Sequence, residues 1–415
     1  DLSLPISPDL LSNRDDLVAA RIVDTIRIAR FVPARLAPEV YVYYELLEAL
    51  ERYGGYRAGN WDSPLPDGDQ DTFYVFPYDW RRDNVETARE LVERIEELKR
   101  KLNRPDLRFN IVAHSMGGLI ARYAAMYGNA DLPAGKETLQ PTWAGASVIN
   151  KIFMFGTPNQ GSMEAFATLL EGFSLTEGLR RRISLLNNLT REDALTVPAL
   201  FQLLPHGEAA RFLDENLQPL ALDLYDPAVW RRYGWSAIVD PEYRQRLTRD
   251  GEERIGKNLP RAVSVNGLDA YFAQVLNRAK RFHEALDAAS PPAPPVALYA
   301  FGGDCEETLA AVVILRDEKR KRWTTLTAPR SFRTSNDRRI SRREATQVMY
   351  EPGDGRVTRR SLLGESSTDG RKASPFNTTL PISYAVFACD LHSGVQKNKT
   401  LQDNALTLLV NEVVN

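Results

Sequence analysis

Ser115 lies at the centre of the pattern in this sequence that most suggests catalysis. Residues 109–118 read FNIVAHSMGG, a short apolar strand followed by a turn and then a helical stretch. A serine between a strand and a helix is typical of a nucleophile elbow, with Ala113 where the first glycine of G-x-S-x-G usually stands. The positions two before and two after the serine, Ala113 and Gly117, are small and let strand and helix approach. We therefore expect Ser115 to be a catalytic nucleophile.

The neighbours of Ser115 have expected roles of their own. The helix directs its N-terminus at the site, so the backbone N–H of Met116 is placed to stabilise an oxyanion. His114 lies inside the elbow and is expected to point elsewhere. The alternative is a serine that caps a helix in a Rossmann-like fold. The strand, turn and helix together favour the nucleophile.

A serine nucleophile needs a general base, and the chain has four histidines. His114 belongs to the elbow. His206 and His283 fall in helical segments, where a partly exposed polar histidine is the simpler interpretation. His392 directly follows the expected last strand, YAVFACD, and in α/β-hydrolases the triad follows the chain order serine, acid, histidine. His392 is therefore the expected base.

Two aspartates could orient His392. Asp354 lies between two glycines in MYEPGDGRV, and Asp304 follows a strand and a glycine pair in YAFGGDCEE. A carboxylate held in a tight turn suits the task of orienting an imidazole and stabilising its charged form. Spacing alone favours Asp354 only slightly, so both remain candidates on this evidence.

The elements around these residues alternate between strands and helices. Apolar strands without a polar face, alternating with helices, indicate a parallel sheet covered on both sides. The expected fold is a mostly parallel, doubly wound α/β-hydrolase sheet with an inserted helical cap. The expected strands are residues 71–76, 109–113, 148–156, 296–301, 346–350 and 384–388, and the expected helices are 38–53, 85–102 and 117–128.

The chain divides into three expected segments. Residues 1–162 form the N-terminal part of the core, 163–290 the helical cap, and 291–415 the C-terminal part of the core. We expect the cap to cover the mouth above Ser115 and to offer an apolar acyl-binding surface, although packing inside the cap is the alternative. The residues concerned are Leu169, Leu170, Phe173 and Leu175. The basic stretch 316–343 reads as a solvated surface hairpin or loop.

Composition excludes several classes of partner. The 415 residues carry 53 basic and 55 acidic side chains, a balance that offers no strong field for nucleic acid. No paired histidines at helical spacing suggest a metal, and no cofactor is expected. Cys305 and Cys389, the only two cysteines, are expected to lie close together because each ends a late core strand. Whether they form a disulfide depends on the compartment, which the sequence leaves unknown.

Several motifs together resemble the lecithin:cholesterol acyltransferase family. They are PYDWR at 77–81, AHSMGG at 113–118, GTPNQGS at 156–162, LLP at 203–205, EPGDGRVTRRSL at 351–362 and the final His392, in the family's order. The resemblance spans residues 35–410 and implies an α/β-hydrolase that acts on lipid esters. The family's catalytic acid is the aspartate of a GDGTV-like segment, which here corresponds to Asp354.

The resemblance also extends to the PYDWR motif, in which Tyr78, Asp79 and Trp80 are expected to line the site. The alternative is a structural network of Asp79 and Arg81 with a packed Trp80. Two departures stand out, because Arg356 replaces a threonine of the acid segment and no apolar strand ending in Pro-Gly precedes Pro38. That strand supplies the second oxyanion N–H in the family, so we expect the natural protein to begin further upstream.

The expected mechanism is acyl transfer through an acyl-Ser115 intermediate. The expected substrate is a lipid or other ester, the acceptor an alcohol or water, and contact with a membrane or lipid interface would be transient. An esterase or lipase that uses only water is the nearest alternative. A catalytically silent, lipid-binding or interaction member of the fold is the alternative from a different class.

Overall fold

The computed structural model describes residues 2–10, 12–17, 19, 25–27, 39–41, 43–133, 135, 137, 139–173, 189–253, 265–289, 294–317, 321–365 and 380–410. Within them, two short pairs of strands and two helices precede the strand that leads to Ser115. These elements are β1 (Thr25–Arg27), β2 (Glu39–Tyr41), α1 (Tyr44–Arg52), β3 (Arg57–Ala58), β4 (Thr72–Phe73) and α2 (Asn84–Lys101). The expected helix over 38–53 is thus wrong in its first part, which is strand β2.

A parallel sheet forms the centre of the molecule. Its strands are β5 (Phe109–His114), β6 (Ile149–Phe155), β9 (Ala297–Gly303) and β16 (Ile382–Ala388), in the spatial order β16-β9-β6-β5. Because parallel strands share a direction, their carboxyl ends meet at one edge, where ligand sites of open α/β sheets are found. The expected strands over 109–113, 148–156, 296–301 and 384–388 are confirmed.

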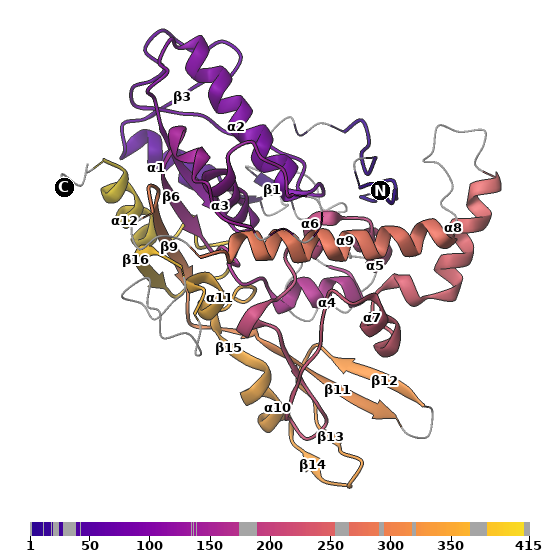
Figure 1. Cartoon of the computed structure of the whole chain (residues 1–415). Coiled ribbons are helices and arrows are strands. Elements are labelled where there is room, and N and C mark those ends of the chain that lie inside the picture. Colours follow the sequence, from indigo (N-terminus) through magenta and orange to yellow (C-terminus); the bar gives the residue numbers. More distant parts are fainter. Residues whose placement is uncertain are drawn as a thin grey trace.

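Helices cover both faces of this sheet, as its apolar strands require. Side chains alternate along β6, so Ile152 and Met154 share a core with α2 and α3 (Met116–Tyr127), while Phe153 and Phe155 share one with α12 (Lys399–Val410). Figure 1 shows α2 and α3 on one side of the strands and α12 beside β16. This doubly wound parallel sheet confirms the α/β-hydrolase fold.

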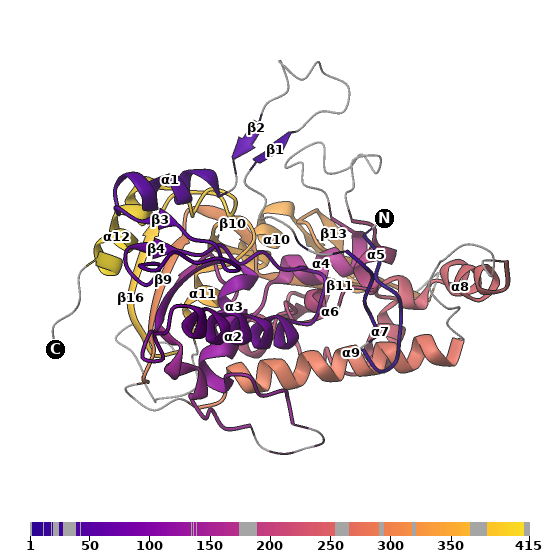
Figure 2. The same cartoon turned by 90° about the horizontal axis from the view of Figure 1, so that it is seen from above.

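The chain between β6 and β9 is mostly helical. Its elements are α4 (Met163–Glu171), α5 (Arg191–Leu195), α6 (Pro198–Phe201), β7 (Arg211–Leu213), β8 (Pro219–Leu220), α7 (Pro227–Tyr233), α8 (Pro241–Glu253) and α9 (Val265–Leu286). The long α9 runs across the middle of the view in Figure 1 and along the lower edge in Figure 2, and Tyr127 of α3 donates its hydroxyl to Ala285 O. The segment expected as a cap is therefore tied to the helix that follows Ser115.

A second sheet joins this segment to the C-terminal part of the chain. Its order is β12-β11-β7-β8, and β7 pairs in parallel with β11. The remaining elements are β10 (Glu306–Leu309), β11 (Ala311–Asp317), β12 (Arg322–Leu326), β13 (Phe332–Arg333), β14 (Arg339–Ile340), α10 (Arg342–Met349), β15 (Tyr350–Gly353) and α11 (Arg359–Leu363). The expected strand over 346–350 is wrong, because residues 342–349 are the helix α10. Across all the residues described, no helix combines the length and the apolar character needed to cross a membrane.

Candidate active site

Ser115 occupies a strained turn at the carboxyl end of β5. Its φ is +55° and its ψ −127°, a conformation that non-glycine residues rarely adopt and that is typical of a nucleophile elbow. The turn is held because the Ser115 N–H donates to Phe155 O at 2.7 Å and the Gly118 N–H donates to Ser115 O at 3.0 Å. Met116 is the first residue of α3, so its backbone N–H has no acceptor within the helix.

The close contact beneath the elbow is at Gly118 rather than at Gly117. A Cβ added at Gly118 would lie 2.0 Å from Thr157 Oγ1, whereas one added at Gly117 would meet only Ala113 Cβ and Tyr78 Oη, each at 3.6 Å. The sequence pattern places the need for a small residue at Gly117. The structure leaves ordinary van der Waals room at Gly117. The residue that must be small is Gly118, one position further along the helix.

Three side chains that are distant in sequence form one hydrogen-bonded chain at this edge of the sheet. His392 Nε2 lies 2.9 Å from Ser115 Oγ, and His392 Nδ1 lies 2.8 Å from Asp354 Oδ2. Because an ionised carboxylate only accepts hydrogen bonds, Nδ1 carries the proton and Nε2 is left to accept from the serine hydroxyl. The imidazole is thus oriented to take the serine proton.

The loop after β15 holds Asp354 as an ion. Its Oδ1 accepts the backbone N–H groups of Arg356 and Val357, and the side chain is 2% exposed. Burial opposes the charged form, but the attraction of His392 and these hydrogen bonds outweigh it and lower the pKa of Asp354. A Cβ at Gly156 would lie 3.0 Å from His392 Nδ1 and 3.1 Å from Asp354 Oδ2, so the pair rests against bare backbone.

Asp304, the other candidate acid, lies elsewhere. Its carboxylate is 3.7 Å from the guanidinium of Arg359, and both side chains are substantially exposed. The backbone of the two acid candidates nevertheless comes close, since a Cβ at Gly303 would lie 2.8 Å from Asp354 Cβ. The geometry therefore joins His392 to Asp354 and leaves Asp304 in a surface ion pair.

His114 contacts the base in a way that sequence reasoning missed. Its Nε2 lies 2.9 Å from His392 O, its Nδ1 lies 3.0 Å from Tyr43 Oη, and its ring centroid is 4.8 Å from that of His392. Burial, and then the neighbouring His392, lower the pKa of His114 to about 3. Since His392 O is only an acceptor, the neutral His114 donates from Nε2 and accepts the Tyr43 O–H at Nδ1.

The PYDWR segment contributes mainly structure. Arg81 is buried and binds both Asp79 and Asp15 through paired hydrogen bonds. The structural network of Asp79 and Arg81 is therefore present. The expectation that Trp80 is packed is wrong, because Trp80 is 40% exposed. The Tyr78 hydroxyl lies beside the start of α3, next to Gly117, and burial raises the pKa of Tyr78, which keeps this hydroxyl protonated.

The apolar residues expected above the site divide into two groups. Leu169 is fully buried in the main core. Leu170 and Phe173 are half-buried, and the guanidinium carbon of Arg356 lies 4.5 Å from the centre of the Phe173 ring. Leu175 lies outside the described residues. Phe173 is thus next to the loop that carries Asp354, whereas Leu169 packs internally.

The two remaining histidines are buried, so the expectation that they are partly exposed is wrong. The rings of His206 and His283 stack with centroids 4.0 Å apart. His283 also contacts Tyr225 Oη at 2.5 Å and Gln202 O at 2.9 Å. Burial, and then the charge of His206, hold the pKa of His283 well below its ordinary value.

Cys305 and Cys389 form a disulfide, which confirms their expected proximity. Their Cα atoms are 5.2 Å apart, and they follow the neighbouring strands β9 and β16. The bond therefore links the ends of two strands from which the Asp304 and His392 loops begin.

Residues 28–219 match the family model described as lecithin:cholesterol acyltransferase. Over this stretch, which is a little less than half of the chain, the sequence is similar to the lecithin:cholesterol acyltransferase family. The matched residues include Ser115 and end before Asp354 and His392. At a general level, this similarity supports a lipid-ester acyltransferase or hydrolase.

Other comparisons add little. No curated protein matches the chain by sequence. A solved structure of a Tle4–Tli4 complex is 14% identical, with a TM-score of 0.49, and the match covers 84% of this chain and 71% of that one. The Bacillus licheniformis lipase BlEst2 in mature form is 10% identical, with a TM-score of 0.33, covering 82% and 79%. These similarities are too distant to inform function.

Proposed function

We propose that this chain is a serine-dependent O-acyltransferase or lipase that cleaves a lipid ester through an acyl-Ser115 intermediate. The observation that carries the proposal is the hydrogen-bonded chain from Ser115 through His392 to Asp354, which begins at a strained elbow. A serine that merely capped α3 would accept a backbone N–H with its side chain, and Ser115 makes no such bond.

The proposed reaction begins with proton transfer to His392. The Ser115 hydroxyl gives its proton to His392 Nε2 while Oγ forms a bond to the ester carbon, and the Met116 N–H stabilises the resulting oxyanion. The leaving alkoxide takes the proton back from His392 as its bond to the acyl carbon breaks. Water or an acceptor alcohol then gives its proton to His392 and attacks the acyl-Ser115 ester. The bond between Ser115 Oγ and the acyl carbon breaks, Oγ takes the proton from His392, and the acyl product leaves.

Electrostatics support the assignment of His392 as the base. Asp354 is ionised and stabilises the imidazolium that forms during each transfer. His114, which stacks against His392, has a pKa of about 3 and stays uncharged, so it does not repel that imidazolium at neutral pH. Two histidines therefore lie side by side, and only one is arranged to take a proton.

An apolar surface beside the site supports a lipid acyl group as substrate. Leu391, which precedes His392, is 38% exposed, and Phe173 lies against Arg356 on the loop of Asp354. We propose that these residues contact the acyl chain. Tyr78 remains proposed to line the site.

Covalent labelling tests the proposed nucleophile. The chain is incubated with a fluorophosphonate probe, the modified peptide is identified by mass spectrometry, and hydrolysis of a soluble p-nitrophenyl ester is measured in parallel. We expect labelling at Ser115 and its loss, together with turnover, in Ser115→Ala. The matched control is Ser147→Ala, at an exposed serine outside the site.

Two outcomes would redirect the proposal. A folded chain that neither reacts with the probe nor turns over ester would be a silent member of the fold. If activity is present, product analysis with and without a sterol or glycerol acceptor separates transfer from hydrolysis. Release of free fatty acid alone under both conditions would indicate an esterase or lipase that uses only water.

A further inference from the structure

A strongly basic segment projects from the edge of the sheet that carries the candidate active site. We name residues 311–344 the basic lobe; it comprises β11 to β14 and the start of α10, and the structure describes 311–317 and 321–344 of it. The segment holds eleven basic and four acidic residues, whereas the rest of the chain holds 42 and 51. A nearly neutral protein therefore carries a concentrated positive charge at one end and a negative excess elsewhere.

The positive side chains of the lobe that the structure describes are exposed. Arg333 and Arg338 pair with Asp337 and Glu344. Arg339, Arg342 and Arg343 are also exposed, and the described residues offer them no acidic partner. Glu215 of the β7–β8 turn also reaches the lobe, where it accepts hydrogen bonds from Ser335. Besides these two ion pairs and Glu215, Arg339, Arg342 and Arg343 keep their charge without an acidic partner among the described residues, and by sequence the lobe has seven more basic than acidic residues.

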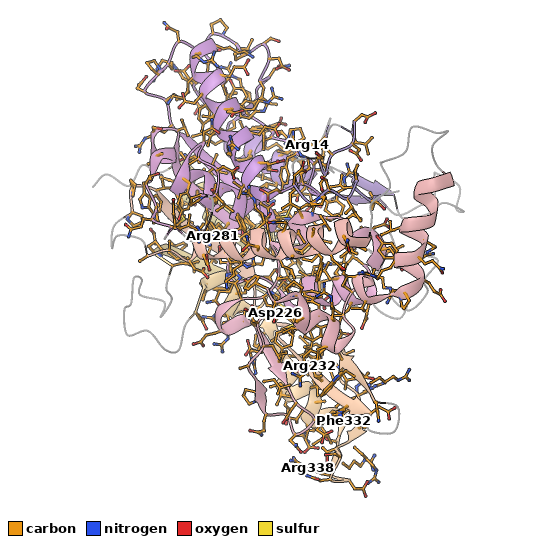
Figure 3. The ribbon with its side chains drawn as sticks, turned by 45° about the vertical axis from the view of Figure 1, so that its right-hand side comes forward. Arg14, Asp226, Arg232, Arg281, Phe332 and Arg338 are labelled. Carbon is orange, nitrogen blue, oxygen red and sulfur yellow. A yellow bond between two sulfur atoms is a disulfide. The ribbon has the colours of Figure 1, made fainter. Side chains whose placement is uncertain are left out.

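Chain topology places the lobe at the same edge as the candidate site. The chain leaves the central sheet after β9, forms β10 and the lobe, and returns in β15, which leads directly to Asp354. Figure 1 shows this part projecting beyond β15 and α11. In Figure 3, Arg232 of α7, Phe332 and Arg338 follow one another toward its tip, while Arg14 lies in the upper part of the view, away from the lobe.

We propose that the basic lobe docks the protein onto an anionic lipid surface. The proposal rests on the proposed function, because a lipid-ester substrate is presented in an aggregate or bilayer. Exposed arginines on short strands and at a helix start suit a broad polyanionic surface, which attracts each nearby Lys or Arg within a Debye length. The negative excess on the rest of the molecule is repelled by the same surface, so docking through the lobe also orients the protein.

Vesicle binding tests this docking independently of catalysis. Ser115→Ala protein is sedimented with phosphatidylcholine vesicles that contain or lack phosphatidylglycerol, at low and high salt. We compare it with a protein that also carries Arg339→Glu, Arg342→Glu and Arg343→Glu. The last two positions open α10, where acidic residues favour the helix, so folding should persist. Removing three such charges should weaken binding on the order of a hundredfold.

A control of equal net charge separates the lobe from general electrostatics. Arg94→Glu, Arg100→Glu and Arg108→Glu change the half-buried Arg94 and two exposed residues on α2 and before β5, away from the lobe. We expect this triple variant to bind anionic vesicles nearly as well as the parent, and both variants, made with Ser115 intact, to hydrolyse a soluble ester normally.

Several results would overturn the docking proposal. The first two are failure of the parent protein to bind vesicles and equal loss of vesicle binding in both triple variants. The other two results are vesicle binding that neither salt nor phosphatidylglycerol affects, and binding of the lobe to an acidic protein or RNA but not to vesicles. Absence of soluble-ester turnover with intact vesicle binding would instead contradict the proposed function alone.

Discussion

His114 shows how a residue next to the nucleophile can position the base. Its Nε2–H reaches the backbone carbonyl of His392, while Tyr43 fixes the tautomer from the other side of the ring. The His392 backbone is also held by its N–H, which donates to Asp354 O at 2.7 Å. We infer that the loop carrying the proposed base is fixed on both sides, by the elbow and by the acid loop.

The choice of acid can be tested with two matched substitutions. In Asp354→Asn the amide favours the wrong tautomer of His392, so kcat for a soluble ester should fall on the order of 10⁴-fold. In Asp304→Asn only a partly exposed pair with Arg359 is lost, a change worth about 1 kcal/mol of stability or less and with little effect on rate. Steady-state kinetics on both proteins, with circular dichroism to verify folding, provides the measurement. A large loss in Asp304→Asn and a small one in Asp354→Asn would show that the acid is misassigned.

For single residues, a local sequence pattern predicts a role better than the spacing between distant residues does. The elbow at Ser115 is encoded in ten consecutive residues, so the sequence was sufficient to predict its strand, turn and helix. The two aspartates follow strands in similar ways, and only the family resemblance separated them. The contact of His114 with Tyr43 joins segments 71 residues apart and leaves no signal in either segment alone.

The packing of α3 against the loop after β6 is the element on which the elbow depends. A methyl group at Gly118 would overlap Thr157, whereas the same group at Gly117 has ordinary van der Waals room. Gly118→Ala should therefore lower the free energy of unfolding by about 1–3 kcal/mol, as overpacking does. Gly117→Ala should be neutral or stabilising by up to about 1 kcal/mol, because alanine favours the helix. Urea denaturation of both variants decides the matter, and equal losses would mean that the contact with Thr157 does not limit the packing.

In each misassigned element, a local signal outweighs the apolar pattern on which the prediction was based. Residues 346–350 have the composition of a short strand, but Ser341 and Glu344 form a capping box that starts α10 eight residues before β15. That signal was present in the sequence and outweighs a five-residue apolar pattern. Before α1, Val40 and Tyr41 favour a strand, so the helical period seen from Pro38 begins only at Tyr44.

Across the whole molecule, the alternation of strands and helices predicted the central sheet, and the pairing of β7 with β11 was not predicted. That pairing joins residues about a hundred positions apart through three backbone-paired residues on each side, too few to impose a recognisable period. The stacking of His206 on His283 is also a long-range contact that the sequence did not predict. His283 lies in a polar helical context in sequence, yet it is buried in contact with Gln202, Tyr225 and the ring of His206.

Burial of neutral histidines makes the stability of the molecule depend on pH. The pKa of His114 is about 3 and that of His283 is well below its ordinary value, so both stay neutral in the folded chain as the pH falls below about 6.5, while the unfolded chain takes up protons. The unfolded state then binds more protons, so stability is retained above that pH and is lost as the pH falls, by about 1.4 kcal/mol per pH unit for each histidine. The lowered pKa of Asp354 acts in the same direction, but only below about pH 4.

The test compares two variants that remove the same hydrogen bond. In His283→Gln the titrating group is gone. The slope of unfolding free energy against pH between about 6.5 and 4.5 should therefore fall by nearly the contribution of one bound proton. In Tyr225→Phe the bond to His283 is lost but the buried imidazole remains, so stability should decrease at every pH with the slope kept. Urea unfolding at a series of pH values measures both quantities. An unchanged slope in His283→Gln would show that this histidine is already protonated in the folded chain, and the acid sensitivity would then have to arise from His114 and the carboxylates.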